Sequence, residues 1–231
     1  MRLLRTLALL AAAPTLALAE IQVVGDGACP TYAADIAAFA TCEGDRVARP
    51  ADDAPMQIAT LAGERVAARK RTDSGLHVTA AEAHRLLQAH PGQVALIDIR
   101  SRAEIAFVGQ PDRVDIHVPY LEPAQPLQWG AGDSGLKMQR NPAFVGEVRA
   151  ELARRDWPED SVILLLCRSG ERSAIAADAL AAAGLPRVFT IVDGFEGDLG
   201  ASGQRIVNGW KNAGAPWQAR PLARLTVEPA H

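Results

Sequence analysis

Short apolar runs alternate with amphipathic segments from about residue 76 onward. Three of these runs are mainly apolar and each is followed by polar residues: 94–99, 161–166 and 188–192. Runs of this length and composition are typical of strands that are buried on both faces of a parallel sheet. We therefore expect three such strands.

Helical patterns fill the intervals between these runs. The sequence T-x-x-E from Thr79 to Glu82 forms a capping box, which predicts the start of a helix that ends near residue 90. Three further segments have the spacing or composition of helices: 144–155, 173–183 and a short one at 207–212. Residues 119–142 are rich in Pro, Gly and Gln and are expected to form a loop. This alternation predicts an α/β protein with a parallel sheet.

The first 19 residues have the pattern of a secretory signal peptide. Arg2 and Arg5 stand before an apolar run, and Ala17-Leu18-Ala19 provides an A-x-A cleavage site. The run is too short to span a membrane, and Pro14 interrupts it. We therefore expect a periplasmic or secreted protein that loses residues 1–19 and has no stable membrane insertion afterwards.

Composition and charge exclude some classes of function. The chain has 231 residues, of which 48% are hydrophobic and 22% charged, so a sizeable core is expected and gross disorder is not. The formal net charge is −3, and it becomes −5 when the two arginines of the signal peptide are removed. A basic footprint for nucleic acid is absent, so no nucleic-acid partner is expected.

Export affects how the cysteines are interpreted. In an oxidising compartment, an odd count suggests one disulfide and one free thiol. Cys29 and Cys42 stand at either end of a short helix-like segment, and a disulfide between them would be worth about 3 kcal/mol. The alternative is two unpaired thiols in the same segment. The Cys and His spacings match no zinc motif, so neither a metal nor a cofactor is expected.

The positions of the polar and Pro-containing stretches along the chain suggest one folded domain with extensions. The basic cluster Arg69-Lys70-Arg71 lies in a polar, Pro-broken connector and is expected to be solvated. The expected division is a signal peptide at 1–19, an N-terminal extension with Cys29, Cys42 and the connector at 20–75, the domain at 76–219, and a C-terminal tail at 220–231.

Candidate chemistry is concentrated in C-R-S-G-E-R-S, from Cys167 to Ser173. Cys167 directly follows an expected strand, and ligand sites in α/β sheets lie at the carboxyl ends of strands. A sharp turn into a helix can direct several backbone N–H groups at one point, and an anion such as a thiolate is favoured there. Cys167 is therefore a candidate nucleophile. The alternative is a buried core thiol, which would need neither the adjacent cations nor Gly170.

The loop sequence C-R-S-G-x-R-S resembles the active-site loop of the rhodanese (sulfurtransferase) family. The resemblance extends over roughly residues 76–219, and its other motifs are less specific. They are Leu96-Ile-Asp-Ile-Arg100 with Glu104, Val118-Pro119, Asp193-Gly194-Phe195, and Asn208 to Gly214.

The resemblance implies a rhodanese-like fold, with helices on both faces of the parallel sheet. It also implies a thiosulfate-sulfurtransferase-like enzyme in which Cys167 carries a persulfide. Together with the signal peptide, this would be an exported, single-domain form of the family. Its partners would be a small sulfur-containing anion and a thiol acceptor, possibly a protein. The remaining residues would divide into an anion-binding loop (Arg168, Ser169, Gly170, Glu171, Arg172 and Ser173) and structural support (Asp98 and Arg100).

The sequence also departs from the family pattern. The family's His is missing between Gly109 and His117, and insertions occur at 120–142 and about 197–207. These insertions are expected either to wall the mouth of the site or dock a partner, or to be inert loops. Two other functions stay open. One is a cysteine-dependent phosphatase or arsenate reductase, which the short loop disfavours, and the other is a non-catalytic anion-binding, partner-binding or redox module.

Overall fold

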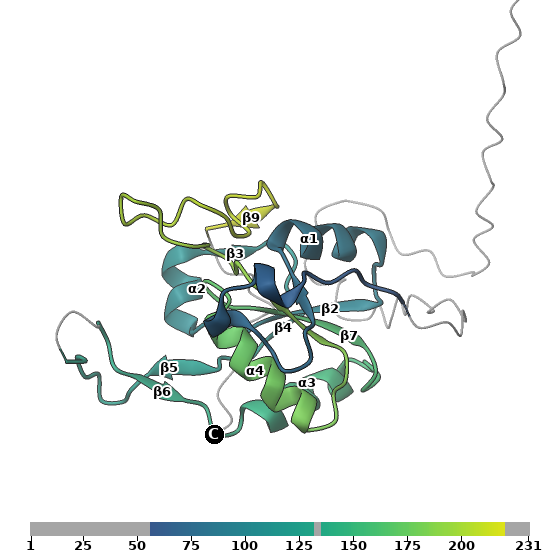
Figure 1. The fold of residues 1–231 in the computed structure, drawn as a ribbon. Helices are drawn as coiled ribbons and strands as arrows, with labels where there is room; N and C mark the ends of the chain where they lie inside the picture. Colours follow the sequence, from purple (N-terminus) through teal and green to yellow (C-terminus); the bar gives the residue numbers. More distant parts are fainter. Residues whose placement is uncertain (1–55, 132–134, 220–231) are drawn as a thin grey trace, which may run out of the picture. The chain divides into compact units, whose positions relative to one another are not determined.

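The structure, a computed structural model, describes residues 56–131 and 135–219. Its centre is a five-stranded sheet in the order β1-β8-β7-β2-β4, in which every neighbouring pair is parallel (Figure 1). This order places β7, the strand that leads to Cys167, in the middle. The five strands are β1 (His77–Val78), β2 (Val94–Asp98), β4 (Ile116–His117), β7 (Val162–Leu166) and β8 (Val188–Ile191). The predicted α/β fold with a parallel sheet is confirmed, as are its three predicted strands.

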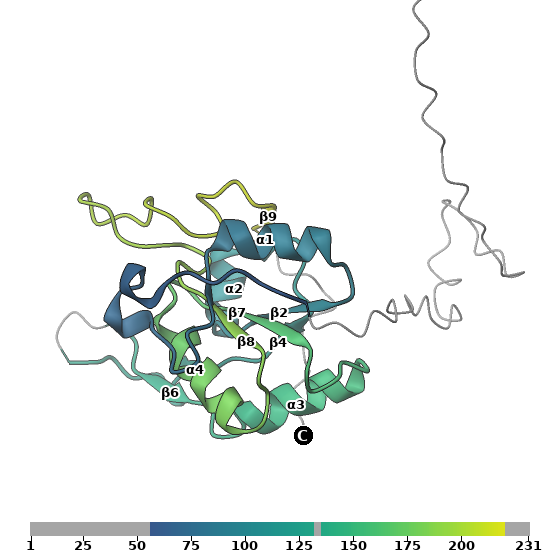
Figure 2. The same cartoon turned by 45° about the vertical axis from the view of Figure 1, so that its right-hand side comes forward.

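Helices cover both faces of this sheet. The helix α1 (Ala80–Ala89) lies on one face, whereas α3 (Phe144–Arg154) and α4 (Glu171–Ala182) lie on the other (Figure 2). Strand β7 divides its side chains between the two faces. Leu164 belongs to the core cluster on the α1 side, and Leu165 belongs to the cluster on the side of α3 and α4. This double burial explains why the strand is an unbroken apolar run.

Capping boxes start two of the helices. At α1, the Thr79 hydroxyl accepts from the Glu82 N–H, and the Glu82 carboxylate accepts from the Thr79 N–H at 2.7 Å, as predicted. The helix α2 (Arg102–Val108) was not predicted, although Ser101 and Glu104 form the same box there. The S-x-x-E sequence was a usable signal for that helix.

Residues 207–212 are a turn, so the prediction of a last helix is wrong. Gly209 has a left-handed φ of +95°, which interrupts helical geometry. The backbone N–H groups also find partners outside their own segment. The N–H of Trp210 donates to the Gly194 carbonyl at 2.8 Å, and that of Lys211 donates to the Phe195 carbonyl at 3.0 Å. These contacts hold the segment against the turn after β8.

The insertion at 120–142 contains a β-hairpin where a loop was expected. Its strands are β5 (Leu121–Pro123) and β6 (Met138–Arg140), which pair antiparallel. The hairpin and residues 197–207 project from the same side of the domain in both ribbon views (Figures 1 and 2). A second small sheet pairs β3 (Gln110–Pro111) with β9 (Trp217–Gln218).

The connector before β1 contains two short 3-10 helices, η2 (Gly63–Arg65) and η3 (Ala68–Lys70), and η3 packs against α4. Lys70 is buried, and its Nζ lies 2.6 Å from a carboxylate oxygen of Asp198. The expected solvation of the basic cluster is therefore wrong for Lys70, because a buried ammonium group needs an anionic partner.

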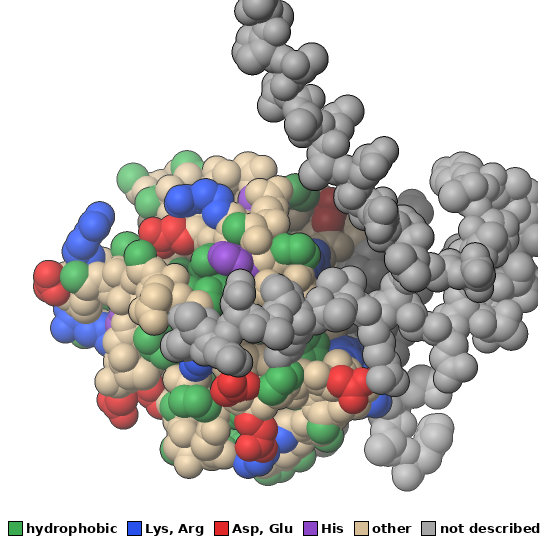
Figure 3. Space-filling model, turned by 90° about the vertical axis from the view of Figure 1, so that its right-hand side faces the viewer, with side chains coloured by type: hydrophobic (Ala, Val, Ile, Leu, Met, Phe, Trp, Pro, Cys, Tyr) green, Lys and Arg blue, Asp and Glu red, His purple; other side chains and the backbone are tan. Residues whose placement is uncertain are grey.

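On the face shown in Figure 3, acidic and basic side chains are scattered among apolar and polar ones. None of the helices in the described ranges has the length and apolar character needed to cross a membrane.

Candidate active site

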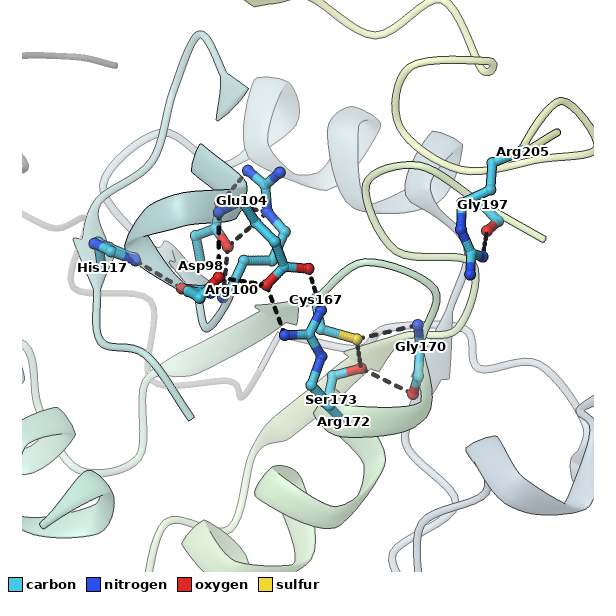
Figure 4. A network of polar contacts seen from close by, with 11 residues as sticks. Asp98, Arg100, Glu104, His117, Cys167, Gly170, Arg172, Ser173, Gly197 and Arg205 are labelled. Atoms are coloured by element: carbon cyan, nitrogen blue, oxygen red, sulfur yellow. Dashed lines mark hydrogen bonds and ion pairs between the residues drawn. The ribbon is translucent and has the colours of Figure 1, made fainter. Parts of the chain in front are cut away.

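Cys167 lies at the carboxyl end of β7, where the chain turns into α4 (Figure 4). Its side chain is buried, with 1% of the residue exposed. The N–H of Gly170 donates to the Cys167 sulfur at 3.1 Å, and the Ser173 hydroxyl lies 3.6 Å from the same sulfur. The loop therefore wraps around Sγ and presents hydrogen-bonding groups to it.

Glycines make this wrapping possible. Gly170 precedes α4 with a φ of +92°, and a Cβ at this position would lie 2.0 Å from the Val192 carbonyl oxygen. Gly194, in the turn after β8, is also closely packed, because a Cβ there would lie 2.6 Å from the Cys167 carbonyl oxygen. The next N–H, that of Phe195, donates to this carbonyl at 2.8 Å. The turn after β8 therefore supports the cysteine loop through direct backbone contact.

Arg172 points its guanidinium at Glu104 on α2. The two side chains form a bidentate ion pair with N–O distances of 2.8 and 2.5 Å (Figure 4). Burial alone would lower the pKa of Arg172, but the hydrogen bonds and charge of Glu104 raise it, and the charge of Cys167 acts in the same direction. Arg172 thus lies close enough to stabilise a thiolate electrostatically, while its planar fork is occupied by protein.

Glu104 belongs to the same motif as Leu96–Arg100, and the sequence alone assigns it no role. Burial would raise the pKa of this carboxyl group, but the hydrogen bonds and charge of Arg172, together with hydrogen bonds from Ser101, lower it to about 2. The carboxylate is therefore ionised at neutral pH, and it links the start of α2 to the start of α4.

Arg168 and Glu171 face outward. Arg168 is exposed, and its side chain forms no hydrogen bond or ion pair within the described part of the chain. The Glu171 carboxylate lies 2.7 Å from Arg69 of the connector, and both side chains are largely exposed. Of the two arginines in the loop, Arg168 is the one whose guanidinium is free to bind an anion. Ser169 is buried within the loop.

Asp98 and Arg100 form a fully buried ion pair at the end of β2. Arg100 Nη2 lies 2.6 Å from Asp98 Oδ2, and the guanidinium lies 4.0 Å above the ring of Phe195. His117 contacts the Arg100 carbonyl at 2.8 Å. The pair therefore joins β2 and β4 to the turn after β8, an arrangement that suits the structural role expected for Asp98 and Arg100.

The structure therefore brings together around the sulfur only part of the predicted loop: Gly170 and Ser173 directly, and Arg172 through its charge. Cys29 and Cys42 lie outside the described residues. Thr190 on β8 also contacts Ser173, and no sequence motif predicts this contact. Within residues 56–131 and 135–219, no group of His, Cys, Asp or Glu side chains could hold a metal ion.

These features define an α/β domain with a cysteine loop at the end of its middle parallel strand. The family model of the rhodanese-like domain matches residues 79–199, which is about half of the chain. The chain belongs to the rhodanese-like domain family.

Several known proteins are similar to part of this chain. The uncharacterized protein RP600 of Rickettsia prowazekii is 31% identical over 123 residues, which cover 53% of this chain and 81% of that protein. The senescence-associated protein DIN1 of Raphanus sativus is 31% identical over 136 residues, or 55% of this chain and 65% of the relative. Among solved structures, that of Rv0390 from M. tuberculosis is 33% identical with a TM-score of 0.46, and covers 62% of this chain and 96% of that one.

Proposed function

We propose that the protein is a sulfurtransferase or persulfide carrier that moves sulfane sulfur from a donor such as thiosulfate to a thiophilic acceptor. The observation that carries this proposal is the environment of Cys167. Its sulfur accepts a hydrogen bond from the Gly170 N–H, lies at the amino end of α4, and is close enough to Arg172 for their charges to interact. Each of these features favours a thiolate, which is the nucleophile that sulfur transfer requires.

The proposed reaction has two displacements. In the first, the Cys167 thiolate attacks the outer sulfur of thiosulfate, a new Sγ–S bond forms, the S–S bond of the donor breaks, and sulfite leaves with the electron pair. In the second, an acceptor nucleophile such as cyanide or a thiolate attacks the outer sulfur of the persulfide. The Sγ–S bond breaks and the thiolate is restored, so that no external oxidant or reductant is needed.

Arg168 is the residue we assign to the donor. Its guanidinium is exposed and free, and it can offer two parallel N–H groups to the oxygens of a sulfur oxyanion. Arg172 takes a different part, because its fork is held by Glu104. It supplies charge behind the thiolate, while Arg168 binds the anion in front of it.

The test is thiocyanate production from thiosulfate and cyanide. The wild type should turn over, and Cys167→Ser should lose the activity, because a hydroxyl group cannot form the persulfide under these conditions. A double variant, Cys29→Ser/Cys42→Ser, serves as the matched control and should retain it. A wild-type protein that binds thiosulfate without forming thiocyanate would overturn the proposal in favour of an anion-binding or redox module.

We further propose that the protein acts in the periplasm or is secreted, with Cys29 and Cys42 joined by a disulfide. The support is the signal-peptide pattern and the odd cysteine count. Mass spectrometry of the exported protein, alkylated without reductant, should find Glu20 at the amino terminus and Cys167 as the alkylated cysteine. Free alkylation of Cys29 or Cys42 would refute the disulfide, and a retained leader would refute the export.

A further inference from the structure

Two buried hydroxyl groups connect the reactive sulfur to the interior of the sheet. The Ser173 Oγ lies 3.6 Å from the Cys167 sulfur and 2.7 Å from the Oγ1 of Thr190 on β8. Neither Ser173 nor Thr190 has any measurable exposed surface. The row Cys167–Ser173–Thr190 thus runs from the loop into the sheet without contact with solvent, apart from the slight exposure of Cys167.

Counting protons determines the direction of these hydrogen bonds. A serine hydroxyl has one proton and two lone pairs. Ser173 Oγ also lies 3.0 Å from the Gly170 carbonyl, which can only accept, so the single Ser173 proton points there. The other two contacts must then be received by Ser173, one from the Cys167 thiol and one from the Thr190 hydroxyl. Thr190 has no second hydrogen-bond partner for Oγ1 among the described residues, which fits its role as donor.

The same count changes when Cys167 loses its proton to solvent. A thiolate can only accept, and a charged acceptor forms a stronger hydrogen bond than a carbonyl. The Ser173 proton is therefore expected to turn from the Gly170 carbonyl toward Sγ. Thr190 can keep donating to Ser173 in both states. This donation polarises the Ser173 O–H bond and makes Ser173 a better donor to the anion, because hydrogen bonds in a chain strengthen one another in a low-dielectric interior.

We infer that Thr190 is a positioning residue for the sulfur chemistry, acting on Cys167 through the Ser173 hydroxyl. The role in sulfur transfer rests on the proposed function, whereas the link from Thr190 to Cys167 rests on the contacts described above. Packing alone gives no reason for a hydroxyl group here. The other residues of β8 are Val188, Phe189 and Ile191, and valine has the shape of threonine without the cost of burying a polar group.

The charged and titratable side chains around this row are few. His77 on β1 stands opposite Thr190 in the strand register, and burial lowers the pKa of His77, which keeps its ring neutral at neutral pH. Asp178 acts on His77 through its charge. Arg172 remains the cation near Cys167. Among the described residues, the Thr190 hydroxyl bonds to Ser173 and to none of these charged or titratable groups, so Thr190→Val removes that hydrogen bond while leaving their own contacts in place.

The experiment measures the rate at which iodoacetamide modifies Cys167 at fixed neutral pH, read by peptide mass spectrometry on the full chain. Thr190→Val should slow the reaction by about threefold to tenfold, the size expected for one neutral hydrogen bond. Thr190→Ser should restore most of the rate because it returns the hydroxyl. Ile191→Val, a conservative change of a buried apolar side chain on the same strand, is the control for a small disturbance of the core and should leave the rate unchanged.

A double-mutant cycle tests the path of the effect. Ser173→Ala should slow alkylation at least as much as Thr190→Val, and the Ser173→Ala/Thr190→Val pair should be no slower than Ser173→Ala alone, because Thr190 acts only through Ser173. An unchanged rate in Thr190→Val, or additive effects in the double variant, would overturn the inference. In thiosulfate turnover, Thr190→Val should lower kcat and leave KM unchanged.

The two proposals fail separately. Iodoacetamide reports the reactivity of the thiol and needs no sulfur donor, so the alkylation rates test Thr190 even in a protein that forms no thiocyanate. A protein that forms thiocyanate with Thr190→Val as fast as the wild type would keep the proposed function and lose the role of Thr190.

Discussion

At the scale of single residues, the two arginines of the cysteine loop have different surroundings although they stand four positions apart. The side chain of Arg172 is mostly buried and is held to Glu104 by two hydrogen bonds, whereas Arg168 is exposed with a free guanidinium. The sequence pattern treats both as anion-binding groups. The structure separates them into a cation that acts on the thiolate and a cation that is available to a substrate.

This difference predicts different effects on catalysis. Arg168→Ala should raise KM for thiosulfate about tenfold, the scale of a charge-assisted hydrogen bond, with a smaller change in kcat. Arg168→Lys keeps the charge but loses the planar pair of N–H donors, so its KM should lie between those of the wild type and Arg168→Ala. Arg172→Ala should instead lower the melting temperature, because it leaves Glu104 partly buried without its partner. Equal KM increases in the two alanine variants, without loss of stability, would contradict this assignment.

Glu104 also predicts a particular response to acid. Its pKa is lowered from an ordinary value of 4.5 to about 2, so its folded-state pKa lies below the unfolded one. The stability it contributes is therefore present above pH 4.5 and is lost as the pH falls toward 2, an amount of about 3 kcal/mol. Denaturant unfolding between these pH values should show a smaller decrease in stability for Glu104→Gln than for the wild type. Parallel decreases would contradict the expectation.

At the scale of elements, the strand-to-helix turn depends on the close approach of two backbones. Gly170 shows this most clearly. A Cβ at this position would clash with the Val192 carbonyl, and the backbone φ is one that other residues rarely adopt. Gly184, at the other end of α4, has a φ of +93° and open space where its Cβ would be. Both glycines thus have a positive φ, but only Gly170 lacks the space for a Cβ.

Alanine substitution at these two positions separates the constraints. Gly184→Ala should cost about 1 kcal/mol of stability and leave thiosulfate turnover intact. Gly170→Ala should cost more and should also lose most of the turnover, because the displaced backbone moves the N–H that donates to Sγ. Similar turnover in both variants would show that the position of this N–H is unimportant for the reaction.

Elements that depend on local sequence were predicted better than those held by distant contacts. The runs that form β2, β7 and β8 and the capping box at Thr79 could be read directly, because burial on both faces and helix capping leave local patterns. The short edge strand β4 leaves no such pattern. The segment at 207–212 has the composition of a short helix, but it forms a turn because its backbone partners lie in the distant turn after β8.

The residues of the site divide in the same way, into those marked by local sequence and those held by distant contacts. Cys167 and Gly170 were identified from one contiguous motif, because the strand-to-helix turn is local. The pairing of Arg172 with Glu104 and the contact of Ser173 with Thr190 join elements far apart in sequence. Residue types alone did not specify these partners.

At the scale of the whole molecule, the connector before β1 holds the surroundings of the site together. Lys70 of η3 pairs with Asp198 in the insertion at 197–207, and Arg69 pairs with Glu171 beside the cysteine loop. The first pair is mostly buried on the lysine side, with 5% of that side chain exposed, whereas the second is open to solvent. The two contacts should therefore differ in energetic weight.

Asp198→Ala should lower the free energy of unfolding by about 2 kcal/mol or more, because it leaves a buried ammonium group unpaired. Arg69→Ala should leave it nearly unchanged, since exposed ion pairs contribute little. The Lys70→Met/Asp198→Ala variant should recover much of the loss, because the unpaired charge is gone. Urea unfolding of the full chain measures all three. A double variant no more stable than Asp198→Ala would show that the ion pair is not the cause.

Detection of a persulfide on Cys167 is the most direct test of the proposed sulfur transfer. The purified protein is incubated with thiosulfate, freed of excess donor and analysed by intact and peptide mass spectrometry, before and after addition of cyanide. If Cys167 carries the transferred sulfur, its peptide gains the mass of one sulfur atom, cyanide removes this mass, and thiocyanate appears in equal amount. Thiocyanate formation without any sulfur on Cys167, or by Cys167→Ser at the wild-type rate, would contradict this role of Cys167.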